Sequence, residues 1–177
     1  MDATLTVFES RGLAGLSMAA VAKAAGVATG TIYTYFDDKA ALVRAVHAAI
    51  RMGSARRMRE AKPTRDRYPE RLRAYVEAYF DDALAHEREF AFLDQFKRSP
   101  YVRPEDHSAV IEAFRFLLNI IGDGVREGFL SEAAPQAHLY CMDGVIRAMV
   151  AYRTNADGPL AEARDGAWTY TWRAIKA

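Results

Sequence analysis

Side chains that carry hydroxyl groups are concentrated in one short stretch of the sequence. Three threonines and two tyrosines occur there within seven positions, with one glycine among them: Thr29, Gly30, Thr31, Tyr33, Thr34 and Tyr35. Hydroxyls can donate hydrogen bonds to phosphate oxygens, and threonine methyl groups can contact the methyl group of thymine. A glycine inside a helix lowers the stability of the helix by about 1 kcal/mol relative to alanine. Such a glycine is expected where the backbone must approach another surface closely. The stretch is therefore a candidate DNA-binding surface.

An ordinary amphipathic helix is the alternative interpretation of this stretch. Ile32 and Phe36 stand four positions apart, so they share one helix face and are expected to pack against preceding helices. The other residues would then form a weakly charged, solvated face. Such a face gives no reason for two exposed tyrosines beside a glycine, which favours the binding interpretation.

The residues just before this stretch predict a second short helix and a tight turn. Ser17 suits an N-cap, and an apolar-periodic run follows it up to Ala25. Gly26 stands where a helix ends in a left-handed residue, and Val27 is expected to be buried inside the turn. Two short helices joined by such a turn are typical of a helix-turn-helix. Many other helical hairpins have this spacing, so spacing alone leaves DNA binding open.

The charge of the chain is unevenly distributed. The overall net charge is +1, but residues 1–62 hold nine Lys/Arg and five acids, whereas residues 63–177 hold 15 Lys/Arg and 18 acids. A basic part joined to an acidic part suggests that the basic part, residues 1–62, binds a polyanion. A difference of this size is also common in proteins that bind no nucleic acid.

Helical periodicity runs along nearly the whole chain and predicts an all-α fold. Glycine, proline and acidic pairs interrupt it, and Pro63-Thr64 marks the best domain boundary. The periodicity predicts about nine helices, at residues 2–11, 18–25, 29–35, 38–60, 69–86, 88–98, 104–128, 135–153 and 159–176. We expect an N-terminal three-helix helix-turn-helix domain at residues 1–50, with a linking helix to about residue 62, and a C-terminal helical bundle at residues 63–177.

Several classes of protein are disfavoured by composition and motifs. The 51% hydrophobic and 27% charged residues are those of a globular chain, and no apolar run approaches a membrane span. Cys141 is the single cysteine, and the sequence lacks HExxH, GxxxxGK[ST] and GxSxG motifs. No secretory signal is recognised at the start. We therefore expect a cytoplasmic protein without enzymatic activity, cofactor, metal site or membrane partner.

Residues 16–42 resemble the DNA-binding domain of the tetracycline-repressor (TetR) family. The family pattern is a Ser or Thr, an apolar-rich helix, Ala-Gly-Val, Gly-Thr-Leu/Ile-Tyr-x-Tyr/His-Phe, and a Lys that begins the next helix. This sequence matches it nearly without gaps, from Ser17 through residues 25–27 and 30–36 to Lys39. The resemblance covers about residues 2–50, and the remainder agrees in length and helical pattern.

The resemblance implies roles for individual residues. Ser17 would cap the second helix and contact a phosphate, and Lys39 would hold a phosphate where the fourth helix begins. The implied DNA-binding residues are Ser17, Ala28, Thr29, Gly30, Thr31, Tyr33, Thr34, Tyr35 and Lys39. The family often has Ser at position 28, whose cap Ala28 cannot reproduce, at a typical cost of about 1 kcal/mol. Family members also carry upstream residues, often basic, and we expect weaker binding without them.

The resemblance further implies an effector cavity and a dimer interface in residues 63–177. Aromatic side chains at helical spacing are core by default, but some could line a cavity between helices. The candidates for contact with a small, mainly apolar effector are Phe92, Phe96, Phe116, Asn119, Tyr140 and Arg147, with Asp94 and Gln95 as further polar candidates. The candidates for the dimer interface are Met142, Ile146, Met149, Trp168 and Trp172, whose apolar stripes suit self-association or burial within one subunit.

The function predicted in this way is ligand-responsive regulation of transcription. We expect a repressor that binds a near-palindromic operator of double-stranded DNA as a homodimer and is released by a small-molecule effector. The alternative is a helical protein-interaction module without DNA binding, whose tyrosine-rich helix is a docking surface. An activator, or a regulator without a ligand, fits the same residues.

Overall fold

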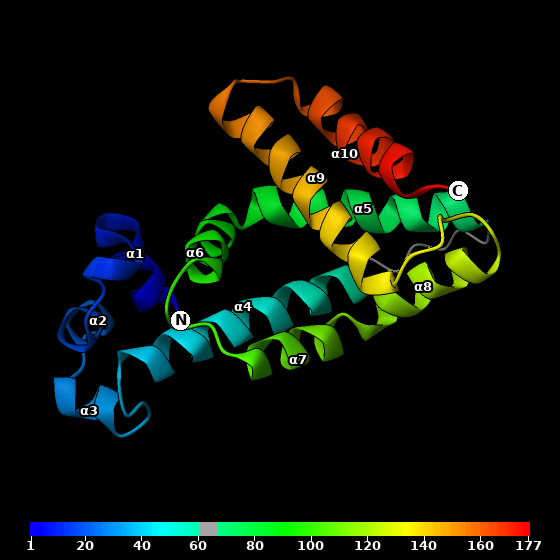
Figure 1. Ribbon diagram of the computed structural model, residues 1–177. Helices are drawn as coiled ribbons and strands as arrows, with labels where there is room; N and C mark the ends of the chain where they lie inside the picture. Colours follow the sequence, from blue (N-terminus) through cyan, green and yellow to red (C-terminus); the bar gives the residue numbers. More distant parts are fainter. Residues whose placement is uncertain (61–66) are drawn as a thin grey trace. The chain divides into compact units, whose positions relative to one another are not determined.

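A computed structural model describes residues 1–60 and 67–177, without the side chains of residues 107 and 109. The described residues form helices throughout, apart from one isolated bridge between Leu130 and Lys176. The helices are α1 (Asp2–Gly15), α2 (Met18–Ala25), α3 (Thr29–Tyr33), α4 (Lys39–Glu60), α5 (Tyr68–Ala85), α6 (Glu87–Lys97), α7 (Pro104–Ala113), α8 (Arg115–Arg126), α9 (Pro135–Asn155) and α10 (Leu160–Ile175) (Figure 1). The predicted all-α fold class is confirmed.

The prediction of one helix over residues 104–128 is wrong. Two helices stand there, α7 and α8, and Phe114 separates them with φ −100° and ψ 13°. The described residues therefore contain ten helices instead of about nine. Neither proline nor glycine marks position 114, and the apolar periodicity continues across it. The buried ring of Phe114 shows that tertiary packing accompanies this break.

The chain divides into two compact units. The first consists of residues 1–53 and 86–112, and the second of residues 54–85 and 113–177. The first unit thus combines the helix-turn-helix region with α6 and most of α7. The boundary predicted at Pro63-Thr64 lies outside the described residues.

The first unit is held together by a core to which α1, α2, α4 and α6 contribute. Phe92 of α6 meets Phe8 of α1 edge-on, with ring centroids 5.2 Å apart, and Phe96 stacks on His47 of α4 at 4.0 Å. Ile32 and Phe36 pack against this core as partly buried residues. The core fixes the inner side of the helix-turn-helix and leaves its outer side to solvent.

The second unit packs α5, α8, α9 and α10 together, and α5 approaches α8 very closely at Gly124. Tyr68 of α5 lies against Gly124 of α8, where any added Cβ would overlap with the phenol ring. The same ring stacks on Phe129, with centroids 4.9 Å apart. The Tyr68 hydroxyl is buried and has no hydrogen-bond partner among the described residues. Burial raises the pKa of Tyr68 from 10.0 to about 12.

Tyr68→Phe should flatten the dependence of stability on alkaline pH. Because the folded-state pKa of Tyr68 is raised, the native chain holds this proton more tightly than the unfolded chain does. The contribution of this raised pKa to stability is complete below pH 10.0 and is lost as the pH rises towards about 12. The loss is at most about 3 kcal/mol. Urea unfolding at pH 8 and at alkaline pH should show a larger loss of stability in the native sequence than in Tyr68→Phe. Equal losses would contradict the burial of this hydroxyl.

Candidate DNA-binding surface

The helix-turn-helix begins with the N-cap that the sequence predicts. The hydroxyl of Ser17 accepts a hydrogen bond from the backbone N–H of Ala20 at 3.2 Å, and Ser17 itself is extended and exposed. Such a cap satisfies one of the amides that a helix start leaves unpaired. The predicted cap of α2 is therefore confirmed.

The turn between α2 and α3 is closed by Gly26. Its φ of 69° and ψ of 28° are left-handed, and its N–H donates to the carbonyl of Lys23. Glycine adopts this conformation without strain. The expectation that Val27 is buried inside the turn is wrong, because 41% of its surface is exposed. The turn therefore adds an apolar side chain to the surface beside α3.

The recognition helix, α3, is one short turn of helix with a clear inner and outer side. It begins after Ala28, which makes no side-chain cap, and it ends at Tyr33, two residues earlier than predicted. Successive residues of a helix are about 100° apart. With Ile32 packed inward, the opposite side is centred on Gly30 and Thr34. Thr31 and Tyr33 flank that side.

The predicted contact residues of α3 are all exposed. Thr29, Gly30, Thr31 and Thr34 lie on the surface, and Tyr33 and Tyr35 expose 52% and 76% of their areas. A Cβ at Gly30 would meet nothing within 4 Å, and its φ is not positive. Neither packing nor backbone conformation within the described chain therefore requires glycine at this position. The missing side chain of Gly30 leaves the space directly outside the helix open.

Lys39 has an intramolecular role that the sequence does not reveal. Its ammonium group donates to the carbonyl of Ala14 at 2.9 Å and lies 5.6 Å from the ring centroid of Tyr101. The carbonyl belongs to the last turn of α1, where helix carbonyls lack helical partners, and the ring contact is a cation–π geometry. Lys39 thus links the start of α4 to α1. Two further N–H donors of the ammonium remain for a phosphate.

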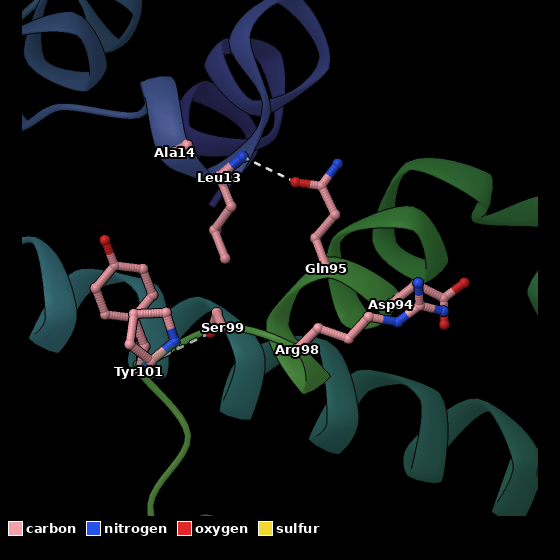
Figure 2. Close-up of a pocket in the computed structure, with 8 residues that line it drawn as sticks. Leu13, Ala14, Asp94, Gln95, Arg98, Ser99 and Tyr101 are labelled. Atoms are coloured by element: carbon pink, nitrogen blue, oxygen red, sulfur yellow. Dashed lines mark hydrogen bonds between the residues drawn. The ribbon is translucent and has the colours of Figure 1, made fainter.

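A pocket of about 740 Å³ lies next to this link within the first unit. Figure 2 shows Gln95 of α6 reaching the backbone N–H of Leu13, which donates to Oε1 at 3.0 Å. Leu13 follows Gly12, where a positive φ of 63° interrupts α1. The pocket is lined by Leu13, Ala14, Asp94, Gln95, Arg98, Ser99, Pro100 and Tyr101. This lining mixes apolar and polar side chains, and it includes neither Phe92 nor Phe96.

The predicted effector residues fall into different units. Phe92 and Phe96 are fully packed in the core of the first unit, where neighbouring side chains surround their rings. The second unit contains Phe116, Asn119, Tyr140 and Arg147. Asn119 and Tyr140 are exposed there, whereas Phe116 and Arg147 are half-buried.

Arg147 belongs to a polar cluster inside the second unit. Its Nε donates to Asp143 at 2.9 Å, and the hydroxyl of Tyr79 donates to the same carboxylate at 2.6 Å. The arginine and aspartate side chains are only 17% and 14% exposed. Charges at such depth need partners, because desolvation is costly. The sequence shows Arg147 as a candidate, but it gives no signal that Tyr79, 64 positions from Asp143, completes the cluster.

The predicted dimer residues need one correction. Met142 and Ile146 are completely buried within a single chain, so they have no surface for a partner. Met149, Trp168 and Trp172 remain partly exposed, and the two tryptophan rings stack with centroids 5.2 Å apart. In the apolar stripe of α9, Met142 and Ile146 therefore pack into the interior of the second unit.

Among the described residues, neither a cluster of metal ligands nor a membrane-spanning helix is present. No group of three or more His, Cys, Asp and Glu side chains is placed there to hold a metal ion. None of the described helices is long and apolar enough to cross a membrane.

Comparisons with known proteins point to one family. Residues 1–46 match the family described as "Bacterial regulatory proteins, tetR family". The HTH-type transcriptional regulator BetI of Burkholderia thailandensis is 35% identical over 112 residues, which are 60% of this chain and 57% of that protein. BetI of Burkholderia mallei is 36% identical over 109 residues, 58% of this chain and 55% of the relative. The matched region thus spans little more than half the length of these curated relatives.

Solved structures agree with the fold over nearly the whole chain. A putative TetR-family regulator from Shewanella sp. PV-4 superposes with a TM-score of 0.90 at 23% identity, covering 99% of this chain and 95% of that one. A TetR-family regulator from Marinobacter aquaeolei VT8 gives 0.87 at 21% identity, covering 99% and 92%. At these identities the likeness concerns the fold. Residues 1–46 are thus similar to the TetR family, and the fold of the chain is similar to that of solved TetR-family regulators.

Proposed function

We propose that this chain is a ligand-responsive regulator that binds a near-palindromic operator as a homodimer and represses transcription. The observation that carries the proposal is the outer side of α3, where Gly30, Thr31, Tyr33 and Thr34 are exposed above an inward-packed Ile32. A helix of this kind enters the major groove with its exposed side towards the bases. Regulators of the TetR family bind DNA, typically as dimers and with small-molecule effectors.

The proposed DNA contacts divide into phosphate and base contacts. Tyr33, Tyr35, Ser17 and Lys39 carry hydroxyl or ammonium groups suited to phosphate oxygens. The threonines and Gly30 of α3 would face the base edges, with Ala28 and Thr29 at its start. Residues 24–36 contain no charged side chain. Affinity would therefore depend on hydroxyls, backbone amides and the cations on either side of α3.

For the effector and the dimer, the second unit offers the better-supported residues. The half-buried pair of Arg147 and Asp143, together with Tyr79, supports a site for a ligand with at least one polar group. Partly exposed Trp168 and Trp172 on α10 support a partner surface there. An effector would release DNA by binding more tightly to the conformation that does not bind the operator.

Replacing Tyr33 and Lys39 together with alanine should abolish specific DNA binding. The double variant removes one exposed phenol and one ammonium group from the proposed phosphate contacts. The measurement is fluorescence anisotropy with duplexes covering the region upstream of the gene for this chain, at several salt concentrations. The native chain should lose affinity steeply with salt, since each phosphate contact releases counterions.

Two further variants make this experiment decisive. Tyr33→Ala alone leaves the link from Lys39 to Ala14 in place, so it separates a lost DNA contact from a loosened first unit. Lys97→Ala removes the same charge from the end of α6 and should preserve binding. If the native chain bound no duplex at low salt, the protein-interaction module would become the better interpretation.

A further inference from the structure

We infer that the recognition helix reads thymine methyl groups, so that A·T base pairs form the part of the half-site that α3 contacts. This inference rests on the proposed function and specifies the DNA sequence that the same surface would select. It depends on which side chains α3 presents and on which it lacks.

The side chains that read guanine and adenine by paired hydrogen bonds are missing from this segment. Arg and Lys pair with guanine, and Asn and Gln pair with adenine, through two hydrogen bonds on the major-groove edge. Residues 24–36 contain none of these four residue types and no acid that would accept from cytosine. Base-edge recognition by α3 must therefore use single hydroxyl contacts or apolar contacts.

The outer side of α3 is suited to apolar contact with a methyl group. Thr34, which directly follows α3 as its C-cap, donates its hydroxyl proton to the carbonyl of Thr31 in that helix at 2.6 Å. The donor is thus committed to the helix, so that towards a base Thr34 offers its methyl group and the acceptor lone pairs of its hydroxyl. Thr31, which flanks this side of α3, adds a second methyl group.

Two neighbouring features strengthen this inference. Val27, in the turn before α3, is 41% exposed although it is fully apolar. Gly30, between the threonines, leaves open space above the backbone, which lets the helix come close enough for methyl groups to touch. Of the four bases, thymine alone presents a methyl group in the major groove. The apolar side of α3 therefore matches thymine.

The test begins with selection of binding sites from a random duplex library by the full chain, at one fixed salt concentration. Each thymine of the selected half-site is then replaced singly by deoxyuridine, which removes the methyl group and keeps the hydrogen-bonding pattern. At contacted positions the affinity should fall about fourfold for each buried methyl group lost. Thr34→Ser or Thr31→Ser should bind thymine and deoxyuridine equally at the position that the threonine contacts.

Serine is a mild replacement here because it keeps the hydroxyl and, at position 34, the hydrogen bond to the carbonyl of Thr31. Thr154→Ser on α9 is the matched control, since the Thr154 hydroxyl also bonds a carbonyl of its own helix, that of Val150, at 3.0 Å. The control should keep the full preference for thymine over deoxyuridine.

Four outcomes would overturn the inference. Selected half-sites whose affinity depends on G·C pairs, or thymines that deoxyuridine replaces without loss, would overturn the thymine reading while DNA binding stands. If both serine variants still bound thymine more tightly than deoxyuridine, residues other than Thr31 and Thr34 would contact the thymine methyl groups. Failure to select any sequence, with no binding of duplex DNA at low salt, would overturn the proposed function as well.

Discussion

Gly30→Ala is expected to stabilise the folded chain and to weaken its binding to DNA. Glycine costs about 1 kcal/mol relative to alanine inside a helix. The new methyl group meets no atom of the protein within 4 Å, so thermal unfolding should show an equal or higher Tm. On DNA the same methyl group would stand between the helix backbone and the base edges. Overpacking of this kind costs about 1–3 kcal/mol, which corresponds to a rise in Kd of about fivefold to 150-fold.

The opposite signs of these two effects make the experiment informative. A variant that loses affinity because it is poorly folded would lose stability as well, whereas this one should gain it. Gly144→Ala on α9 is a matched control, since its added methyl group also meets open space and lies outside the proposed surface. Its affinity for DNA should be unchanged. Unchanged affinity in Gly30→Ala would mean that α3 does not approach DNA with this side.

Gly124→Ala is expected to cause the largest loss of stability among the glycine replacements considered. The added Cβ would overlap with the hydroxyl group and the ring of Tyr68, which is buried and stacked on Phe129. A rigid ring held on both sides cannot move aside without disturbing α5 or α8. We expect a loss near 3 kcal/mol, at the upper end of what overpacking costs, measured by urea unfolding at neutral pH.

The clash itself can be tested with a second replacement. In a chain that carries Tyr68→Leu, the side chain no longer reaches the backbone at position 124, so adding Gly124→Ala should cost much less than it does alone. A double-mutant cycle measures this coupling, which is expected to exceed about 1 kcal/mol for residues in direct contact. If the two replacements were additive, the contact between Tyr68 and Gly124 would not limit the packing of α5 on α8.

The local sequence determined most of the helix-turn-helix, because the necessary signals are short-range. Ser17 supplies the cap of α2, Gly26 supplies the left-handed residue, and Ile32 and Phe36 mark the inner side of α3. Each signal acts within four residues of the backbone it controls. Local rules of capping, turn conformation and helical spacing therefore sufficed to place the outer side of α3.

Where local rules compete with tertiary packing, the sequence was a poorer guide. The break at Phe114 carries no glycine or proline, so periodicity predicted one helix in place of two. Val27 is apolar, which predicted burial, yet the turn leaves it exposed. The apolar spacing on α9 fitted contact with a partner chain and burial within one chain equally well. In the structure, Met142 and Ile146 are buried within the single chain.

The sequence by itself determined the helical class, the order of the N-terminal helices and the residues that the outer side of α3 exposes. Only the tertiary structure decided that Phe92 and Phe96 fill the core of the first unit, that Lys39 bonds to Ala14 and lies over Tyr101, and that Tyr68 occupies the space beside Gly124. The physical reason is separation along the chain. Caps and turns act between neighbouring residues, whereas these contacts join residues 25 or more positions apart, and their pairing depends on how the whole core packs.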